Sequence, residues 1–167
     1  PAVDIIALVK IPSSPINNPH KVKLLKARLS GAPLEGFELA GGRQVWKDGV
    51  IEIRSETAIS SYAIPYPEKD LLLDLQATML VQSDDRNIRE QAAKIIGNGK
   101  DAREAATKLN TWVYEAINKQ PVVSIPSAVE VLKQKVGDCN EHTTLYTALA
   151  RAAGIPSRMA AGIVYMK

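Results

Sequence analysis

The stretch GDCNEHTTLYTALARAAGIPSR, residues 137–158, decides the fold of the second half of this 167-residue chain. It predicts a helix over residues 139–153. Asp138 is a favourable N-cap, and Glu141 three residues later can complete a capping box. Gly154 suits the left-handed position that ends many helices, and a proline two residues later prevents continuation. Apolar side chains recur at helical spacing, so we expect this helix to be buried along most of its length.

Cys139 is the only cysteine in the chain and would be the first residue of this helix. A lone cysteine is commonly a small buried hydrophobic residue, but such a residue is expected on the apolar face in mid-helix. At a helix start, unsatisfied N–H groups and the helix dipole favour a thiolate. The position therefore indicates a nucleophilic thiol, and Gly137 would let a substrate approach closely. One cysteine also excludes a disulfide within the chain.

The same stretch resembles the nucleophile helix of the transglutaminase-like superfamily, papain-related cysteine enzymes that include transglutaminases and bacterial peptidases. The matching positions are Gly137, Asp138, Cys139, Glu141, His142, Leu145, Ala148, Leu149, Arg151, Gly154, Ile155, Pro156 and Arg158. Residues 102–132 resemble the helices that precede the cysteine in bacterial members. Tyr146 stands where phenylalanine is more usual, and its hydroxyl would need a polar outlet. The resemblance implies a bacterial protein of α+β class, with a papain-like core.

The resemblance implies covalent acyl transfer, in which the thiolate of Cys139 attacks a peptide or carboxamide carbonyl. The backbone N–H of the same residue is a candidate for stabilising the oxyanion. Asp138, Gly137 and His142 are candidate supporting residues, and no cofactor is expected. Water as acceptor would make the protein a hydrolase, such as a peptidase, whereas an amine would make it a transglutaminase. The alternative is a non-catalytic member of the same fold that binds a peptide or protein.

In this family the catalytic histidine and aspartate lie on strands beyond the first strand after the nucleophile helix. The resemblance therefore implies that the chain ends before both residues and is inactive alone. The two histidines present are poor candidates for the base. His142 would point along the wall of the cysteine's own helix, and His20 lies in a proline-flanked loop far away in sequence. A metal site at Cys139, Glu141 and His142 would lack a second pair of ligands.

Turn signals and β-branched residues predict a β-rich module over residues 1–66. We expect strands over residues 4–11 and 22–29 and a hairpin over residues 44–54, turned by Asp48 and glycine. Trp46 should face Ile51 across the hairpin. The sequence does not reveal the function of this module.

Residues 67–167 are predicted to form a partial transglutaminase-like core. Helices are expected over residues 87–96 and after two further capping pairs, Asp101 with Glu104 and Ser127 with Glu130. A continuous apolar stripe places Trp112 in the core. Residues 157–166 read as the first strand of a sheet, and an open edge there predicts a homodimer of this chain.

The net charge is +3, and lysines and arginines are spread among acidic residues without a basic run. This pattern does not favour nucleic acid as a partner, and a peptide or protein substrate is the expected partner. No apolar stretch approaches the roughly 20 residues that span a bilayer. The bacterial relatives implied by the resemblance include exported proteins, so an extracytoplasmic location is an expectation from resemblance alone.

Overall fold

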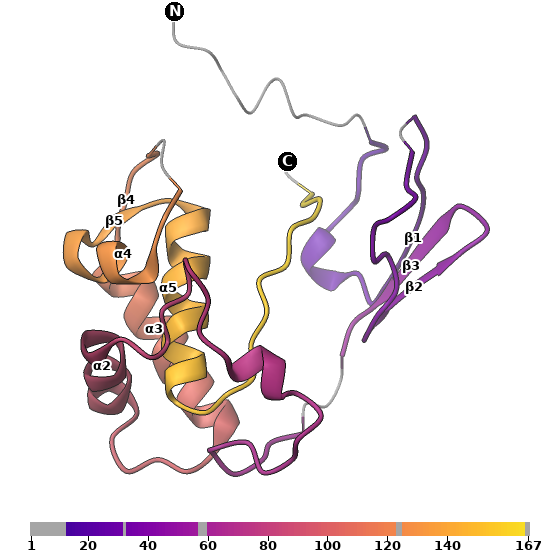
Figure 1. Cartoon of the computed structure of the whole chain (residues 1–167). Coiled ribbons are helices and arrows are strands. Elements are labelled where there is room, and N and C mark those ends of the chain that lie inside the picture. Colours follow the sequence, from indigo (N-terminus) through magenta and orange to yellow (C-terminus); the bar gives the residue numbers. More distant parts are fainter. Residues whose placement is uncertain (1–12, 32, 57–59, 123–124, 166–167) are drawn as a thin grey trace, which may run out of the picture. The chain divides into compact units, whose positions relative to one another are not determined.

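The computed structural model describes residues 13–31, 33–56, 60–122 and 125–165. The chain divides into two compact units, residues 1–59 and 60–167, which we describe separately (Figure 1). The division places residues 60–66 in the helical unit, whereas the sequence assigned them to the β-rich module. The predicted strand over residues 4–11 lies outside the described residues.

The first unit contains an antiparallel sheet of three strands in the order β1-β3-β2. The strands are β1 (Leu24–Arg28), β2 (Gln44–Lys47) and β3 (Val50–Arg54), and a short 3-10 turn, η1 (Pro19–Lys21), precedes them. The predicted hairpin is confirmed, and Trp46 pairs with Ile51. Asp48 and Gly49 both have positive φ angles, 51° and 74°. Two left-handed residues in a row make the tight turn that matches the twist of the flanking strands.

The second unit is a helical bundle around a central helix. Its helices are α2 (Arg86–Ile96), α3 (Ala102–Ala116), α4 (Ala128–Gln134) and α5 (Cys139–Ala152), with a 3-10 helix, η2 (Leu72–Leu75), and a two-stranded parallel pair, β4 (Asn118–Lys119) and β5 (Val136–Gly137). Helix α5 packs against α2, α3 and α4 (Figure 1). The predicted α+β class is therefore confirmed. No helix among the described residues is long and apolar enough to cross a membrane.

Polar side chains fix the helix starts as the sequence predicted. The carboxylate of Asp101 accepts a hydrogen bond from the N–H of Glu104 at 2.8 Å, and the hydroxyl of Ser127 accepts one from Glu130 at 3.4 Å. Helix α2 begins one residue earlier than predicted, because Asp85 caps it through two backbone N–H groups. Each cap satisfies a donor that the first helical turn leaves without a partner.

Helix α5 ends at Ala152, and Gly154 two residues later has a φ of 81°. The N–H of Ile155 reaches back to the carbonyl of Ala150 at 2.9 Å, the bond pattern of a Schellman cap. A Cβ atom on Gly154 would lie 2.7 Å from the Cα of Pro65. The glycine therefore allows both the turn and the close approach of residues 60–66. The N–H of Tyr66 also donates to the carbonyl of Gly154 at 2.9 Å, which ties this segment to the helical unit.

The strand predicted over residues 157–166 is not formed among the described residues, which reach 165. The N–H of Ser157 donates to the carbonyl of Asp74 at 2.9 Å. Beyond it, residues 158–164 make no backbone hydrogen bond within the described part of the chain. The segment runs back beside α5 (Figure 1), where the hydroxyl of Thr144 donates to the sulfur of Met159 at 3.8 Å. A strand needs a neighbour, and none of the described strands lies beside this one.

Candidate active site

The structure places Cys139 at the first position of α5, with its side chain exposed. The body of the helix is buried, because Leu145, Ala148 and Leu149 have no exposed surface. A buried helix thus holds the thiol at a fixed place on the surface. The backbone N–H of Cys139 makes no hydrogen bond within the described residues. It is therefore available to a group that approaches the sulfur.

The predicted capping box is present at the start of α5. The carboxylate of Asp138 accepts a hydrogen bond from the N–H of Asn140 at 3.0 Å. In return the carboxylate of Glu141 accepts one from the N–H of Asp138 at 2.9 Å. Glu141 is only 2% exposed, so this bond lies inside the protein. The box fixes the backbone on both sides of Cys139.

Gly137 is buried two residues before the cysteine, where the side chain of Glu141 covers it. A Cβ atom at this position would lie 2.3 Å from both Cβ and Cγ of Glu141 and 2.8 Å from its Oε2. No real Cβ contact is that short, so the fold itself requires glycine here. The sequence suggested a different reason, namely close approach of a substrate. The structure thus makes Gly137 and Glu141 a matched pair.

His142 lies one turn into α5 and is held by the backbone of Asp138. Its Nδ1 is 2.6 Å from the carbonyl oxygen of Asp138. A carbonyl only accepts, so Nδ1 carries the hydrogen and Nε2 is the acceptor nitrogen of the neutral ring. Nε2 is buried and has no hydrogen-bond partner within the described part of the chain. His20 lies exposed in η1, in the other unit. The described contacts therefore bring neither histidine to the sulfur of Cys139.

Two further segments contact residues close to Cys139 in the chain. The pair β4–β5 sets residues 118–119 beside residues 136–137, and the N–H of Gln120 donates to the carbonyl of Gly137 at 3.1 Å. The second segment follows α5 and contacts Thr144 through Met159. Sequence reasoning missed Gln120, because a pairing across this distance leaves no local signal.

Trp112 and Tyr146 have packing roles. Trp112 packs against the buried core, as predicted, and the Nζ of Lys135 lies 5.9 Å from the centre of its ring. Tyr146 is partly buried, and burial, with a smaller contribution from Tyr62, raises the pKa of its hydroxyl above the ordinary value of 10.0. Its hydroxyl makes no hydrogen bond among the described residues, so it is left to hydrogen-bond with the solvent.

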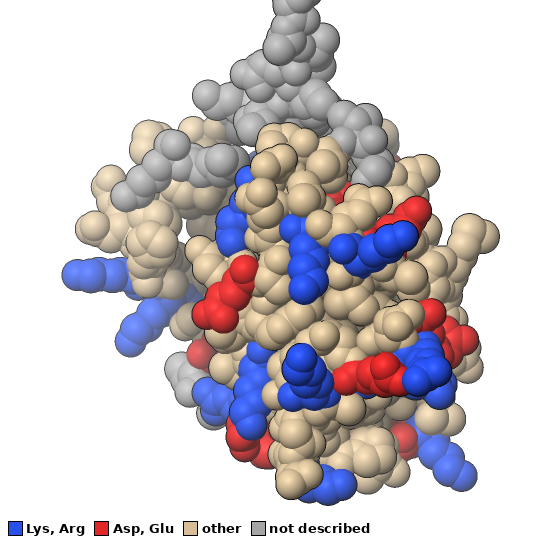
Figure 2. Space-filling view, turned by 90° about the vertical axis from the view of Figure 1, so that its left-hand side faces the viewer, with Lys and Arg blue, Asp and Glu red and all other residues tan. Residues whose placement is uncertain are grey.

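The described residues contain no group of three or more His, Cys, Asp or Glu side chains placed to hold a metal ion. Around Cys139 this has a clear cause. Glu141 turns to the N–H of Asp138 and His142 to its carbonyl, so neither extends toward the sulfur. Basic and acidic side chains are mixed on the face of the molecule in Figure 2, without a patch of one sign.

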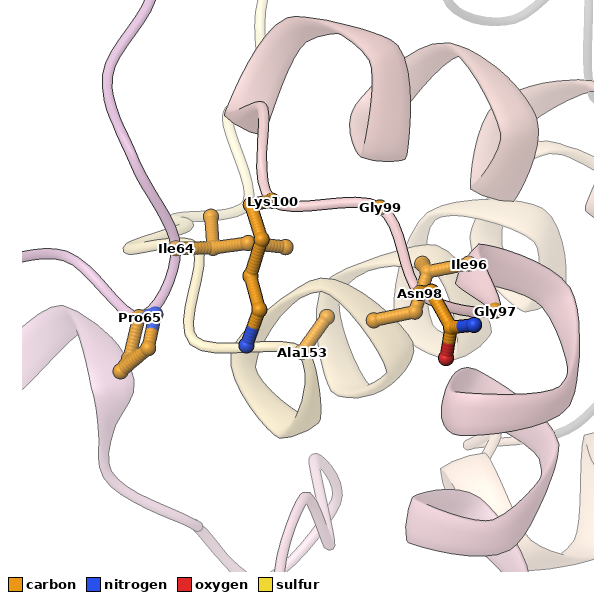
Figure 3. A pocket seen from close by; sticks show the side chains of 8 residues that line it. All are labelled: Ile64, Pro65, Ile96, Gly97, Asn98, Gly99, Lys100 and Ala153. Carbon is orange, nitrogen blue, oxygen red and sulfur yellow. The ribbon is translucent and has the colours of Figure 1, made fainter.

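Two cavities lie at the opposite end of α5 from Cys139. One, of about 400 Å³, is lined by residues that include Ile64, Pro65, Lys100 and Ala153, and Figure 3 shows the side chains of its lining. The other, of about 450 Å³, borders Arg151 and Ala152 at the end of the helix. The surface around the thiol is distinct from both.

The family model described as the transglutaminase-like superfamily matches residues 89–167. Residues 89–167 belong to the transglutaminase-like superfamily. This transglutaminase-like region includes α3, α4, α5 and most of α2, and it contains Gly137, Asp138, Cys139 and His142. The resemblance seen in the sequence is confirmed.

Two solved structures are similar to the chain. One is described as a "Putative Cysteine Protease" from Cytophaga hutchinsonii, with 16% identity and a TM-score of 0.49 over 68% of this chain and 48% of that one. The other is a "Putative Protease" from Parabacteroides distasonis, with 15% identity and a TM-score of 0.40 over 68% of this chain and 27% of that one. The chain thus spans less than half the length of either protein. No curated protein matches it.

Proposed function

We propose that the chain is part of a cysteine enzyme in which the thiolate of Cys139 attacks a peptide or carboxamide carbonyl. The observation that supports it is the placement of an exposed thiol at the first position of a buried helix, next to its own unbonded N–H. Unsatisfied N–H groups and the helix dipole at this end favour negative charge. Membership of residues 89–167 in the transglutaminase-like superfamily is consistent with this chemistry.

In the proposed reaction the sulfur of Cys139 forms a bond to the carbonyl carbon, and the carbonyl electron pair moves to oxygen. The N–H of Cys139 donates to that oxyanion. Collapse of the intermediate expels the amine, which takes up a proton, and leaves a thioester on Cys139. Water then releases an acid, as in a peptidase or amidase, or an amine releases a new amide, as in a transglutaminase. We favour the peptidase.

We propose that His142 is not the general base. Its Nδ1 is engaged by the carbonyl of Asp138, and its Nε2 is buried, so proton transfer from the thiol would require the ring to leave its place. We therefore expect the 167-residue chain to show no peptidase, amidase or transglutaminase turnover by itself. Turnover that disappears in both Cys139→Ala and His142→Gln would contradict this assignment.

Alkylation tests the proposed nucleophile directly, because Cys139 is the only thiol. The matched control is Thr143→Cys in a Cys139→Ala background, which moves an exposed thiol one turn along the same helix. Iodoacetamide near pH 7 should modify Cys139 roughly two- to fivefold faster than the control thiol, since the dipole effect is strongest at the helix end.

The alternative function is a binding-only member of the same fold, in which Cys139 has no chemical task. Equal alkylation rates at positions 139 and 143, in native proteins with the same circular dichroism, would remove the basis for a nucleophile and favour this alternative. Cys139→Ala gives the background signal in each measurement. Denatured samples of both cysteine proteins should react at one common rate, because the helix no longer distinguishes the two thiols.

We also propose that two copies of this chain pair along residues 158–164. These residues make no backbone hydrogen bond within the described part of the chain, and Ile163 and Val164 are 70% and 77% exposed. Residues 159–164 carry no charge, so antiparallel pairing with a second copy places no like charges opposite each other. Light scattering should show a dimer that Ile163→Lys weakens and Leu73→Lys, at an equally exposed site, does not. A monomer at all concentrations would contradict the pairing.

A further inference from the structure

The cavity at the C-terminal end of α5 combines charged and polar groups from three parts of the helical unit. It measures about 450 Å³ and is lined by Leu75, Gln76, Ala77, Ser83, Asp84, Arg89, Arg151 and Ala152. Along the helix, Arg151 lies twelve residues after Cys139, a separation of about 18 Å at 1.5 Å per residue. The cavity is therefore separate from the proposed nucleophile.

Arg151 presents a fixed positive charge at this cavity. Its Nε and Nη2 donate to the carbonyl of Ser157 at 2.9 and 2.7 Å, and its Nη1 donates to the carbonyl of Gln76 at 2.6 Å. Within the described residues it pairs with no carboxylate. These bonds use three of the five N–H donors of a guanidinium and immobilise it. The remaining donors and the whole charge are available to a ligand.

Ser83 and Arg89 add two further donors to the lining. Ser83 is only 6% exposed, and its hydroxyl makes no hydrogen bond within the described part of the chain. Because the Ser83 hydroxyl is not among the fully buried polar atoms and has no partner within the described residues, it can donate to a ligand in the cavity. Arg89, on the first turns of α2, is also without an ion pair among the described residues. Asp84 is the one acidic residue of the lining, which leaves its net charge at +1.

We propose that this cavity binds a small oxyanion, a carboxylate or a phosphate, through Arg151, Arg89 and Ser83. Guanidinium groups suit both ligands, because two N–H donors can engage two oxygens at once. The hydroxyl of Ser83 supplies a directed donor inside the cavity. Asp84 opposes the ligand charge, so the site should prefer a singly charged anion to a more highly charged one. The proposal is independent of the reaction at Cys139 and adds a second binding site to the same helix.

Calorimetric titration of the whole chain tests the site, with inorganic phosphate and N-acetylglycine as separate probes. The ionic strength is held constant, and sodium chloride serves as the blank. Arg89→Gln should weaken binding by about tenfold, because it removes a charge-assisted hydrogen bond. Ser83→Ala should weaken it roughly threefold. Asp84→Asn should tighten binding, because it removes the like charge. We leave Arg151 unchanged, since it also holds two backbone carbonyls.

Arg86→Gln is the matched control, because Arg86 lies on the same helix, is exposed and pairs with Glu90 instead of lining the cavity. It should leave the affinity unchanged. Saturable binding of phosphate or of N-acetylglycine supports the proposal, and the probe that binds more tightly identifies the ligand class. Failure of the unmodified chain to bind either probe would overturn it. Equal weakening by Arg86→Gln and Arg89→Gln would also overturn it, since the binding would then reflect general surface charge.

Discussion

Gly137→Ala tests whether the turn before Cys139 is built as the structure indicates. The new Cβ would lie 2.3 Å from two carbons of the Glu141 side chain. Relief is possible in two ways. The backbone can shift, at the cost of about 1–3 kcal/mol that overpacking of a core commonly brings. Alternatively the Glu141 side chain can rotate away, which leaves the N–H of Asp138 without its acceptor and costs about 1–3 kcal/mol.

Either route gives the same expectation, a loss of about 2 kcal/mol from the free energy of unfolding of the helical unit. Small domains are stable by only about 5–15 kcal/mol, so this loss is readily measured. Urea unfolding followed by circular dichroism at 222 nm reports on this unit, because α2 to α5 all belong to it. Alkylation of Cys139 in the native protein should also change, since the turn positions the first residue of α5.

Gly162→Ala is the matched control for this substitution. A Cβ atom on Gly162 would meet no other atom within 4 Å, and its φ is not in the left-handed region. The control should therefore unfold at the urea concentration of the unmodified chain. A loss below about 0.5 kcal/mol for Gly137→Ala, equal to that of the control, would refute the inferred contact between Gly137 and Glu141.

Three further predictions address other parts of the helical unit. Gly154→Ala should cost about 2–4 kcal/mol in urea unfolding, because it places a Cβ at positive φ and 2.7 Å from Pro65. In urea unfolding at alkaline pH, Tyr146→Phe should show a smaller fall in the free energy of unfolding with rising pH than the unmodified chain. Because burial raises the pKa of Tyr146 above 10.0, its contribution is complete below about pH 10 and is lost as the pH rises through the folded-state pKa. Asp101→Asn should make the free energy of unfolding depend less on pH in acid, because the hydrogen bond from Ser61 lowers the pKa of Asp101 below 3.8. The stabilisation from Asp101 is present above that pH and is lost as the pH falls. If the free energy of unfolding of Tyr146→Phe in alkali, or of Asp101→Asn in acid, varied with pH as in the unmodified chain, that result would contradict the respective assignment.

The sequence predicted the features whose causes are local. The caps at Asp101, Ser127 and Asp138 act over two or three residues, and the structure contains all three. The hairpin turn at residues 48–49 likewise depends on two residues that accept positive φ. Such signals are complete within one turn of chain, so no knowledge of the tertiary structure is needed to interpret them.

Features that depend on distant segments were not predicted. The pairing of β4 with β5 joins residues 118–119 to residues 136–137, and no pattern in either segment specifies the other. The cavity that contains Ser83, Arg89 and Arg151 has the same origin, because its lining comes from η2 and the chain after it, from α2 and the two residues at 83–84 before it, and from α5. The position of Cys139 followed from its own helix, whereas the burial of its neighbour Glu141 required the packed structure.

The segment after α5 shows why composition alone misassigned a strand. Residues 158–165 are mostly apolar and either β-branched or small, a composition that is typical of a strand buried on both faces. A strand, however, exists only with a partner that accepts and donates its backbone hydrogen bonds, and the described part of the chain supplies none for residues 158–164. Met159 contacts Thr144, five residues along α5 from Cys139, which at 1.5 Å per residue is about 8 Å of helix. Because extended chain advances about 3.3 Å per residue, two or three residues beyond Met159 bring the segment level with the thiol. A strand that pairs with residues 161–164 is therefore expected to lie at the same level along α5 as Cys139.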